Sequence, residues 1–114
     1  MAYQSVTRNA TILNGASLSD AIVNNGAPVA GVYMPAAWTT ADLTLQMSLD
    51  GANFNNVYDK DGTEVTIKAG ASRYIQLNSA DFVGCVAFKI RSGTSGTPVN
   101  QGADRTITAV MLVL

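Results

Sequence analysis

The densest group of side chains that could do chemistry is the acidic run Asp59-x-Asp61-Gly62-x-Glu64. Calcium prefers hard oxygen ligands such as carboxylates and takes about six to eight of them. The run departs from the EF-hand calcium loop, because Gly62 stands at position four rather than six and Gly70 stands where a bidentate glutamate is needed. An Asp-x-Asp-Gly sequence is also typical of a β-turn. We therefore expect a turn that holds no metal ion, with an adventitious calcium site as the alternative.

Histidine is absent from the 114 residues, and Cys85 is the single cysteine. The chain therefore lacks an imidazole general base, a Ser–His or Cys–His pair and an imidazole metal ligand. One cysteine permits neither an internal disulfide nor a thiolate zinc site, and the strand-like run around Cys85 predicts a small buried side chain. Asp42, Asp50 and Asp81 are scattered among predicted turns, so nothing pairs two carboxylates as glycoside hydrolysis requires. We expect no enzymatic activity, no catalytic residue and no cofactor.

The chain carries little charge, with 7 Lys+Arg against 8 Asp+Glu and a charged fraction of 13%. Soluble domains usually have roughly 25% charged residues. A net charge of -1 offers no attraction for nucleic acid or an anionic membrane, so neither is expected as a partner. The N-terminus lacks the apolar stretch of a signal peptide, and no run approaches the ~20 apolar residues of a transmembrane helix. The sequence predicts synthesis in a cytoplasm and a soluble product, unless an assembly carries it elsewhere.

Alternation of apolar and polar residues predicts the strands that would position these side chains. It is strictest over Leu43–Asp50, where every second residue is Leu or Met, so this strand should bury one face and wet the other. Asp50-Gly51 then suits a tight hairpin turn. Further strands are expected at residues 10–13, 18–23, 29–34, 54–58, 64–67, 72–77, 86–91 and 106–114.

Strands that recur about every 8–12 residues, with Gly, Asn or Asp between them, are typical of an all-β sandwich or barrel. We predict a single all-β domain, an antiparallel β-sandwich of jelly-roll-like architecture, over residues 10–114. Residues 1–9 lack a strong pattern and are predicted to form an N-terminal arm that can run extended.

Two segments depart from the alternation. Residues 92–103 are small and polar and predict a long exposed loop. Residues 106–114 are apolar on both faces: Ile107, Ala109, Met111 and Val113 share one face, and Val110, Leu112 and Leu114 share the other. An antiparallel strand with one solvated face needs only one apolar face. Either this strand is central and covered on both faces, or its outer face meets another chain.

The single tryptophan, Trp38, lies in a predicted loop after Pro35. Pro35 marks the end of the preceding strand, because proline cannot donate to a β-ladder. A lone tryptophan at the end of a sandwich most often plugs the core, whereas an exposed one would anchor a sugar or a neighbouring protein. Both interpretations stay open, and Trp38 or Tyr58 lining a groove would favour sugar binding.

Several segments together resemble a known family. Val32-Tyr33-Met34-Pro35-Ala36-Ala37-Trp38-Thr39 leads into Leu43–Phe54, and Val57-Tyr58-Asp59, Gly62-Thr63-Glu64-Val65 and Ser72–Leu77 follow. This arrangement is similar, over roughly residues 30–110, to small head-decoration or cement proteins of tailed bacteriophages. The resemblance implies a β-sandwich that binds the major capsid protein on the outer surface of the virion, as a homotrimer at a threefold position.

The hairpin Ser48-x-Asp50-Gly51-x-x-Phe54 also resembles one in discoidin-like and carbohydrate-binding β-sandwiches. Those modules usually carry a tryptophan near the position of Phe54, together with exposed aromatic residues and often a calcium site. This second resemblance supplies the runner-up, a carbohydrate- or receptor-binding module of a phage tail or fibre.

The leading hypothesis is a non-enzymatic virion protein that ties neighbouring capsid subunits together. The predicted wet faces are mostly Thr, Ser, Gln and Asn, and such a surface packs against protein with little cost of desolvating charge. The candidate assembly contacts are Tyr3 and Arg8 in the N-terminal arm, Trp38, and the outer-face residues Val110, Leu112 and Leu114.

Overall fold

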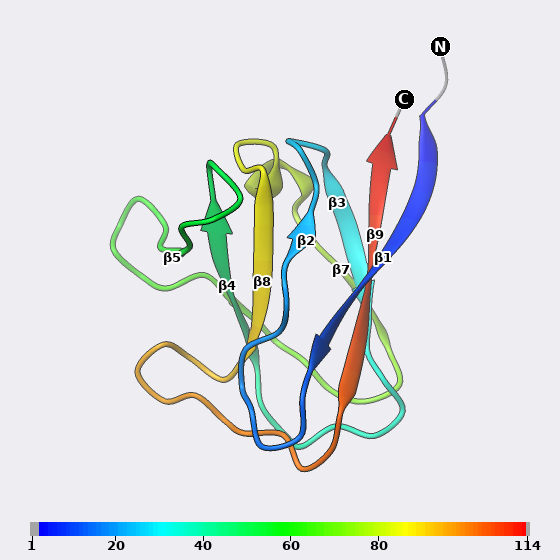
Figure 1. The fold of residues 1–114 in the computed structure, drawn as a ribbon, viewed down its shortest axis with the longest axis vertical. Helices are drawn as coiled ribbons and strands as arrows, with labels where there is room; N and C mark the ends of the chain where they lie inside the picture. Colours follow the sequence, from blue (N-terminus) through cyan, green and yellow to red (C-terminus); the bar gives the residue numbers. More distant parts are fainter. Residues whose placement is uncertain (1–2, 114) are drawn as a thin grey trace.

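The computed structural model describes residues 3–113 as two antiparallel sheets packed face to face (Figure 1). Sheet A has the strand order β1-β9-β3-β7, and sheet B has the order β2-β8-β4-β5, with β6 also paired to β4. The elements are β1 (Gln4–Ile12), β2 (Ile22–Val23), β3 (Val29–Tyr33), β4 (Leu43–Ser48), β5 (Asn55–Asn56), β6 (Thr66–Ile67), β7 (Tyr74–Gln76), the 3-10 helix η1 (Ser79–Phe82), β8 (Ala87–Ser92) and β9 (Arg105–Val113).

The strand pairing is nested. β1 pairs with β9, β2 with β8, β3 with β7, and β4 with β5 and β6, as though the chain were one long hairpin with its tip after β4. Rolling this hairpin up brings β9 beside β3 and β8 beside β4. Such a double-sheet roll is a jelly roll. The predicted all-β, jelly-roll-like sandwich is therefore confirmed.

The core lies between the two sheets and follows the period-2 patterns of the longer strands. Phe82 of η1 closes it at one end and meets the Phe88 ring edge-on, with 5.0 Å between ring centroids. The inward residues of the four principal strands are all nearly inaccessible to solvent: Ala10 and Ile12 of β1, Leu43 and Leu45 of β4, Phe88 and Ile90 of β8, and Ile107, Ala109 and Met111 of β9.

The first strand begins earlier than the pattern suggested. β1 starts at Gln4 and pairs in unbroken register with β9, from Gln4 opposite Val113 to Ile12 opposite Arg105. Residues 4–9 of the predicted arm are thus continuous, in β1, with the body that was expected to begin at residue 10. The N-terminal half of β1 is extended but largely exposed, so it shows no hydrophobic alternation by which sequence could reveal a strand.

Side chains interrupt some of the expected strands. Of residues 18–23, only Ile22–Val23 form a strand, with an isolated bridge from Leu18 to Arg91. Between them, the Ser19 hydroxyl accepts the backbone N–H of Ile90 at 2.9 Å and so replaces a main-chain acceptor. Residues 54–58 are likewise reduced to β5 and a bridge between Tyr58 and Glu64.

The expectation that one face of Leu43–Asp50 is wet is wrong. Thr44 and Ser48 on that face are 0% and 2% exposed, whereas Leu49 is 81% exposed. β4 lies between β8 and the short strands β5 and β6, and later parts of the chain fold across its outer side. Thr44 donates its hydroxyl to the carbonyl of Gly93 at 2.8 Å, which satisfies the buried polar group.

The loop at residues 92–103 is only partly the exposed connection that was predicted. Gly96–Pro98 are exposed, but Gln101 is 1% exposed. The Gln101 amide accepts the backbone N–H of Thr39 at 2.9 Å and donates to the Thr39 carbonyl at 3.0 Å and to the Ser92 hydroxyl at 2.7 Å. The loop is therefore anchored to the β3–β4 connection.

Gly31 of β3 allows a close approach between neighbouring strands. A Cβ at this position would lie 2.3 Å from the Tyr74 hydroxyl oxygen and 2.6 Å from the Ile75 carbonyl oxygen. We expect Gly31→Ala to lower the free energy of unfolding by about 1–3 kcal/mol, because backbone must shift to relieve the overlap. Urea denaturation measures the loss. Gly84→Ala is the control, since nothing lies within 4 Å of its Cβ; equal losses in the two variants would contradict the prediction.

Asp50 organises the turn after β4. Its carboxylate accepts the backbone N–H groups of Asn53 at 2.8 Å and Ala52 at 2.9 Å, and these bonds, with those from the Asn53 and Ser48 side chains, hold the pKa of Asp50 well below its ordinary value. The stabilisation is complete above the unfolded-state pKa of about 3.9 and is lost as pH falls toward the folded-state value.

We expect the stability gap between the native protein and Asp50→Asn to be constant above about pH 5 and to narrow below about pH 4, because Asp50 then binds a proton in the unfolded state while it stays ionised in the folded state. Urea midpoints across this range check it. A gap that does not change with pH would show that the charge of Asp50 contributes nothing.

Candidate interaction surface

The outer face of sheet B is covered by the chain itself. Arg91 projects from β8 onto this face and is 7% exposed. Its guanidinium donates to Asn56 Oδ1 at 2.7 Å and to Thr44 Oγ1 at 3.3 Å, and it pairs with Glu64 Oε2 at 3.5 Å. Glu64 in turn accepts the backbone N–H of Ser95 at 3.1 Å. This buried cluster holds the β5–β6 connection and the loop after β8 over the sheet.

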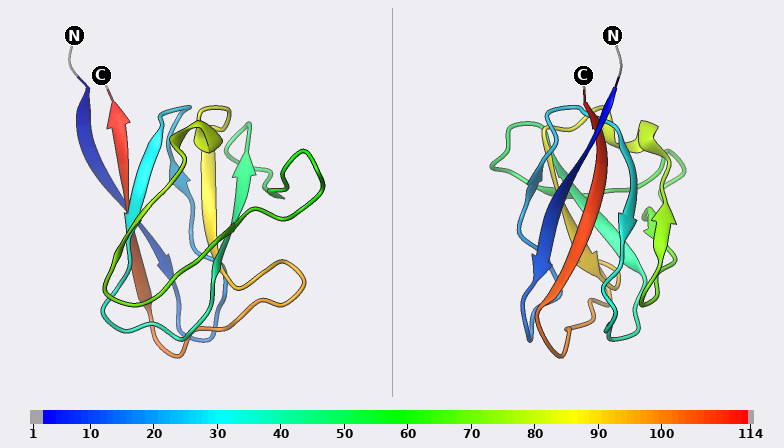
Figure 2. Two further views of the ribbon diagram at one scale, coloured as in Figure 1. Left: turned by 180° about the vertical axis from the view of Figure 1, so that it is seen from behind. Right: turned by 90° about the vertical axis from the view of Figure 1, so that its right-hand side faces the viewer.

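The outer face of sheet A has no such cover. In the right-hand view of Figure 2, β1, β9, β3 and β7 lie side by side with no other segment in front of them. The register brings these residues onto that face, which we call the sheet A face: Ser5, Thr7, Asn9, Thr11, Gly31, Tyr33, Tyr74, Gln76, Thr106, Thr108, Val110 and Leu112. Among these described residues none is charged.

Four polar side chains of the sheet A face bond to one another across strands. The hydroxyls of Thr11 and Thr106 lie 3.2 Å apart, and Thr108 donates to Asn9 Oδ1 at 2.8 Å. Polar groups that already have partners lose little when water is removed from them. This face can therefore be covered by another protein at low cost.

Two tyrosines form the aromatic part of the sheet A face. Tyr33 and Tyr74 are directly opposite one another on β3 and β7, and their ring centroids are 4.7 Å apart. They are 54% and 43% exposed, and the Tyr74 ring lies over Gly31. This pair was not predicted from the sequence. The only signal was that each tyrosine occupies a polar position in its strand's alternation.

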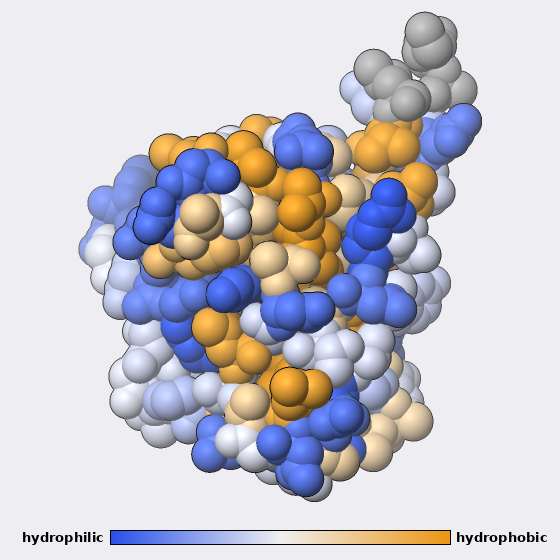
Figure 3. Space-filling view, viewed as in Figure 1, coloured by the Kyte–Doolittle hydropathy of each residue, from blue (hydrophilic) through white to orange (hydrophobic). Residues whose placement is uncertain are grey.

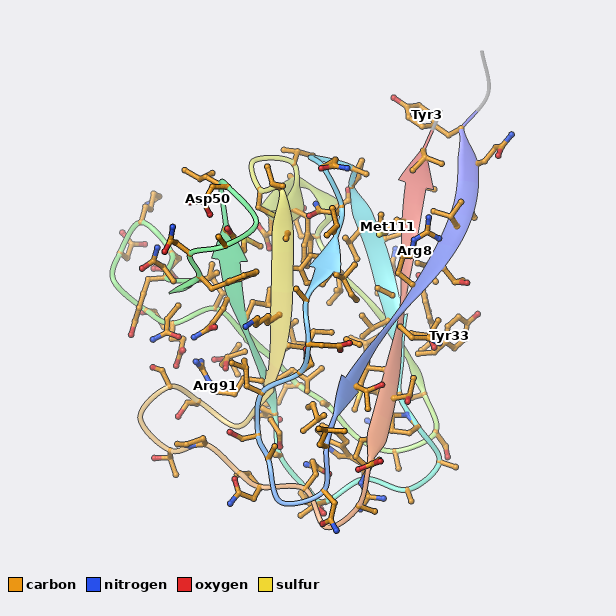
Figure 4. All side chains as sticks on the ribbon, in the orientation of Figure 1. Tyr3, Arg8, Tyr33, Asp50, Arg91 and Met111 are labelled. Atoms are coloured by element: carbon orange, nitrogen blue, oxygen red, sulfur yellow. The ribbon has the colours of Figure 1, made fainter. Side chains whose placement is uncertain are left out.

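The paired ends of β1 and β9 project beyond the sandwich as a two-stranded ribbon (Figure 1). Beneath its inner side is a groove of ≈ 430 Å³. Figure 4 shows Tyr3 at the end of the ribbon, with Arg8 and Met111 below it. Figure 3 shows hydrophobic residues on the ribbon and beneath it. The groove is lined by Tyr3, Arg8, Val23, Asn24, Asn25, Gly26, Ala27, Pro28, Met111, Leu112 and Val113.

The structure brings four of the six predicted contact residues to one region. Val110 and Leu112 are half-buried on the sheet A face, and Tyr3 and Arg8 line the groove on the other side of the same ribbon. Leu114 lies outside the described residues. Trp38 lies apart, in the β3–β4 connection. Figure 1 shows this connection at the end of the sandwich away from the termini.

Trp38 is half-buried, packs against the core and donates its indole N–H to the Ala41 carbonyl at 3.0 Å. This placement agrees with the end-plug interpretation. Tyr58 is 53% exposed, with its hydroxyl 3.4 Å from Ser95 Oγ.

Strand β9 does not fit the first alternative, in which a central strand is covered on both faces. It is central in sheet A, between β1 and β3, and its inward residues Ile107, Ala109 and Met111 are buried. Its outer residues Val110 and Leu112 have no second layer over them within residues 3–113. The strand is thus central but covered on one face, and its second apolar face is uncovered among residues 3–113.

The fold has a counterpart among solved structures, although no protein-family model and no curated protein sequence matches the chain. The structure of the SPBc2 prophage-derived protein YomS superimposes with a TM-score of 0.62 at 8% sequence identity, covering 99% of this chain and 96% of that chain. The likeness therefore extends over nearly the whole of both chains. At this identity it shows a shared fold.

The acidic run at residues 59–64 forms a turn. Asp59 Oδ1 accepts the backbone N–H groups of Asp61 at 2.9 Å and Thr63 at 3.0 Å, while Glu64 turns toward Arg91. Within residues 3–113 no three Cys, Asp or Glu side chains are grouped so as to hold a metal ion. In the same range no helix is long and apolar enough to cross a membrane.

Cys85 is buried, as predicted, at 4% exposure. Its thiol lies 3.4 Å from both Asn24 Oδ1 and the Phe82 carbonyl oxygen. Burial raises the pKa of the Cys85 thiol, which keeps it protonated and unreactive.

Proposed function

We propose that this protein is a non-enzymatic structural protein of a bacteriophage virion, which binds the major capsid protein on the outer surface of the capsid and bridges neighbouring subunits. The observation that carries the proposal is the sheet A face, an uncovered four-stranded surface with no charged residue among those described. The shared fold with a prophage-derived protein and the resemblance to head-decoration proteins support the phage assignment.

The proposed mechanism is the addition of buried interface to an assembled shell. Val110, Leu112 and the Tyr33–Tyr74 pair supply apolar area near the centre of the face, and the bonded threonines around them need no new partners. A protein that binds only the assembled shell stabilises it by mass action. Many symmetric copies, as trimers at threefold positions in this proposal, strengthen the effect through multivalency.

The test compares phage particles assembled with and without this protein. We expect particles that lack it to release DNA at a lower temperature than complete particles. When salt is diluted, they should release DNA at a salt concentration at which complete particles still hold it. Purified protein added back should co-sediment with the particles and restore their stability. Fluorescence of a DNA dye during heating measures the release. Unchanged particle stability, or protein that fails to co-sediment, would contradict the proposed function.

A carbohydrate- or receptor-binding module of a phage tail or fibre is the second candidate. The exposed Tyr33–Tyr74 pair favours it, because aromatic rings on a sheet face can stack on sugar rings. Trp38 does not support it, since that side chain packs against the core. In this case the native protein would bind on a glycan array and the Tyr33→Ala variant would not. Neither the native protein nor the variant would bind capsids. Capsid binding without glycan binding would reject this candidate.

A further inference from the structure

One edge of β1 is open. The backbone N–H of Thr11 is bonded to Asp20 Oδ1 at 2.8 Å, and its carbonyl accepts the Asp20 N–H at 3.3 Å, so the main-chain groups of Thr11 point away from β9. Because this direction alternates along an antiparallel strand, the main-chain groups of Ser5, Thr7 and Asn9 point the same way. Within residues 3–113, β1 pairs with β9 alone. Asp20 thus closes the lower end of this edge. Of the remaining outward groups, the Thr7 carbonyl accepts from the Arg8 guanidinium at 2.8 Å, a contact that an added strand would replace.

Little protects this edge from pairing. Proteins usually block long edge strands with several charges, prolines or bulges. Gln4–Ile12 contains no proline, keeps an unbroken register with β9, and has Arg8 as its one charged residue. The open stretch from Ser5 to Asn9 spans roughly 17 Å at ~3.4 Å per residue. Its exposure makes it a template for an added strand.

The side chains beside the edge indicate the chemistry of the added strand. Arg8 points to the groove side and donates to the Thr7 carbonyl at 2.8 Å, but no described acidic residue pairs with it. Val6, on the same side of β1, is half-buried, and Val23 across the groove is 56% exposed. A partner residue opposite Arg8 would therefore meet an unpaired cation, and one opposite Val6 would meet an apolar surface.

Charge argues against a second copy of this chain as the occupant. Pairing two β1 strands about Thr7 would bring two Arg8 side chains near each other, and residues 1–13 contain no acidic residue to separate them. Like charges on neighbouring strands are destabilising. The occupant should carry the opposite charge.

We propose that the open edge of β1 binds an extended peptide segment of the partner protein by strand addition, with an acidic side chain opposite Arg8 and an apolar side chain two residues away opposite Val6. This inference rests on the proposed function, in which the partner is the major capsid protein. The added strand would also cover the inner side of the ribbon, where the sandwich leaves the groove open.

The experiment uses the whole protein as bait for a displayed library of random peptides about ten residues long. We expect the selected peptides to share an acidic residue two positions from an apolar one. Thr7→Pro removes an outward N–H that the fold does not use, and proline is tolerated there on an edge strand. In calorimetry with synthetic copies of the selected peptides, this variant should bind at least tenfold more weakly than the native protein. Thr7→Val, which keeps the N–H, should change the affinity little.

Arg8→Glu tests the charge. This variant should bind the acidic peptides about tenfold more weakly than the native protein does. Replacing the acidic residue of the peptide with lysine should restore binding to the variant. Hydrogen exchange of backbone amides is measured on the native protein, so its result does not depend on whether the variants fold. Bound peptide should slow the exchange of the Ser5, Thr7 and Asn9 N–H groups.

Failure to select peptides, binding that Thr7→Pro leaves unchanged, or a dimer of the native protein that Thr7→Pro dissociates would each overturn the proposal. Capsid binding is scored separately. Capsids that bind native protein and Thr7→Pro equally would overturn strand addition and leave the proposed function standing. Peptide binding that depends on the β1 edge, without any capsid binding, would support strand addition and contradict the proposed function.

Discussion

Replacing Arg91 with alanine is expected to lower the free energy of unfolding by about 3–5 kcal/mol, the cost of removing one partner from a buried ion pair. Arg91 and Glu64 have side chains only 9% and 13% exposed, so water cannot replace the lost guanidinium. The substitution also leaves Asn56 Oδ1 without its donor at 2.7 Å. Urea denaturation followed by tryptophan fluorescence measures the loss.

Two controls identify the cause. The double variant Arg91→Met with Glu64→Leu should be clearly more stable than Arg91→Ala, because it leaves no unpaired charge. Lys68→Ala removes the Lys68–Asp42 pair, in which the lysine side chain is 93% exposed, and should change stability by less than about 1 kcal/mol. If Arg91→Ala were as mild as Lys68→Ala, the cluster would not be what holds the loops over sheet B.

The second large effect concerns the sheet A face. If the proposed function is correct, Val110→Glu should raise the Kd for capsids by at least about 150-fold, equivalent to roughly 3 kcal/mol, because it buries an unpaired carboxylate in the interface. Val110 lies between Thr7 and Gly31 in the middle of the face. Co-sedimentation with capsids over a range of protein concentrations measures the affinity.

Matched variants separate binding from folding. Val110→Thr keeps the β-branched shape without charge and should bind nearly as well as the native protein. Thr40→Glu adds the same charge at an exposed position in the β3–β4 connection and should bind normally. Unchanged capsid affinity of a folded Val110→Glu protein would rule out the sheet A face as the docking surface.

The strands that could be predicted well are those whose inward residues form a regular apolar alternation. β8 and β9 lie within one residue of their expected bounds, because their inward residues recur at every second position. The N-terminal half of β1 could not be predicted, since it projects beyond the core and has no buried side to mark it. Val110 and Leu112 were predicted as contacts from the same periodicity, because they are apolar and lie on the face of the strand that does not point into the core.

Other parts of the candidate surface required contacts between distant segments. Tyr33 and Tyr74 form a pair only because β3 and β7 align them in register. Arg91 and Glu64 look like ordinary solvated charges in the sequence, and they are buried because the loops around residues 56–64 and 92–101 close over sheet B.

The amino-acid sequence by itself determined the fold class and excluded the chemistry of histidine and of paired cysteines, because alternation and composition are local properties of the chain. Only the tertiary structure decided which sheet face stays bare, and that β1 has an open edge beside an unpaired Arg8. These features depend on which loops cover which sheet and which strands find partners. Such pairings join residues up to 109 positions apart, as Gln4 and Val113 are, and no local pattern in the sequence records them.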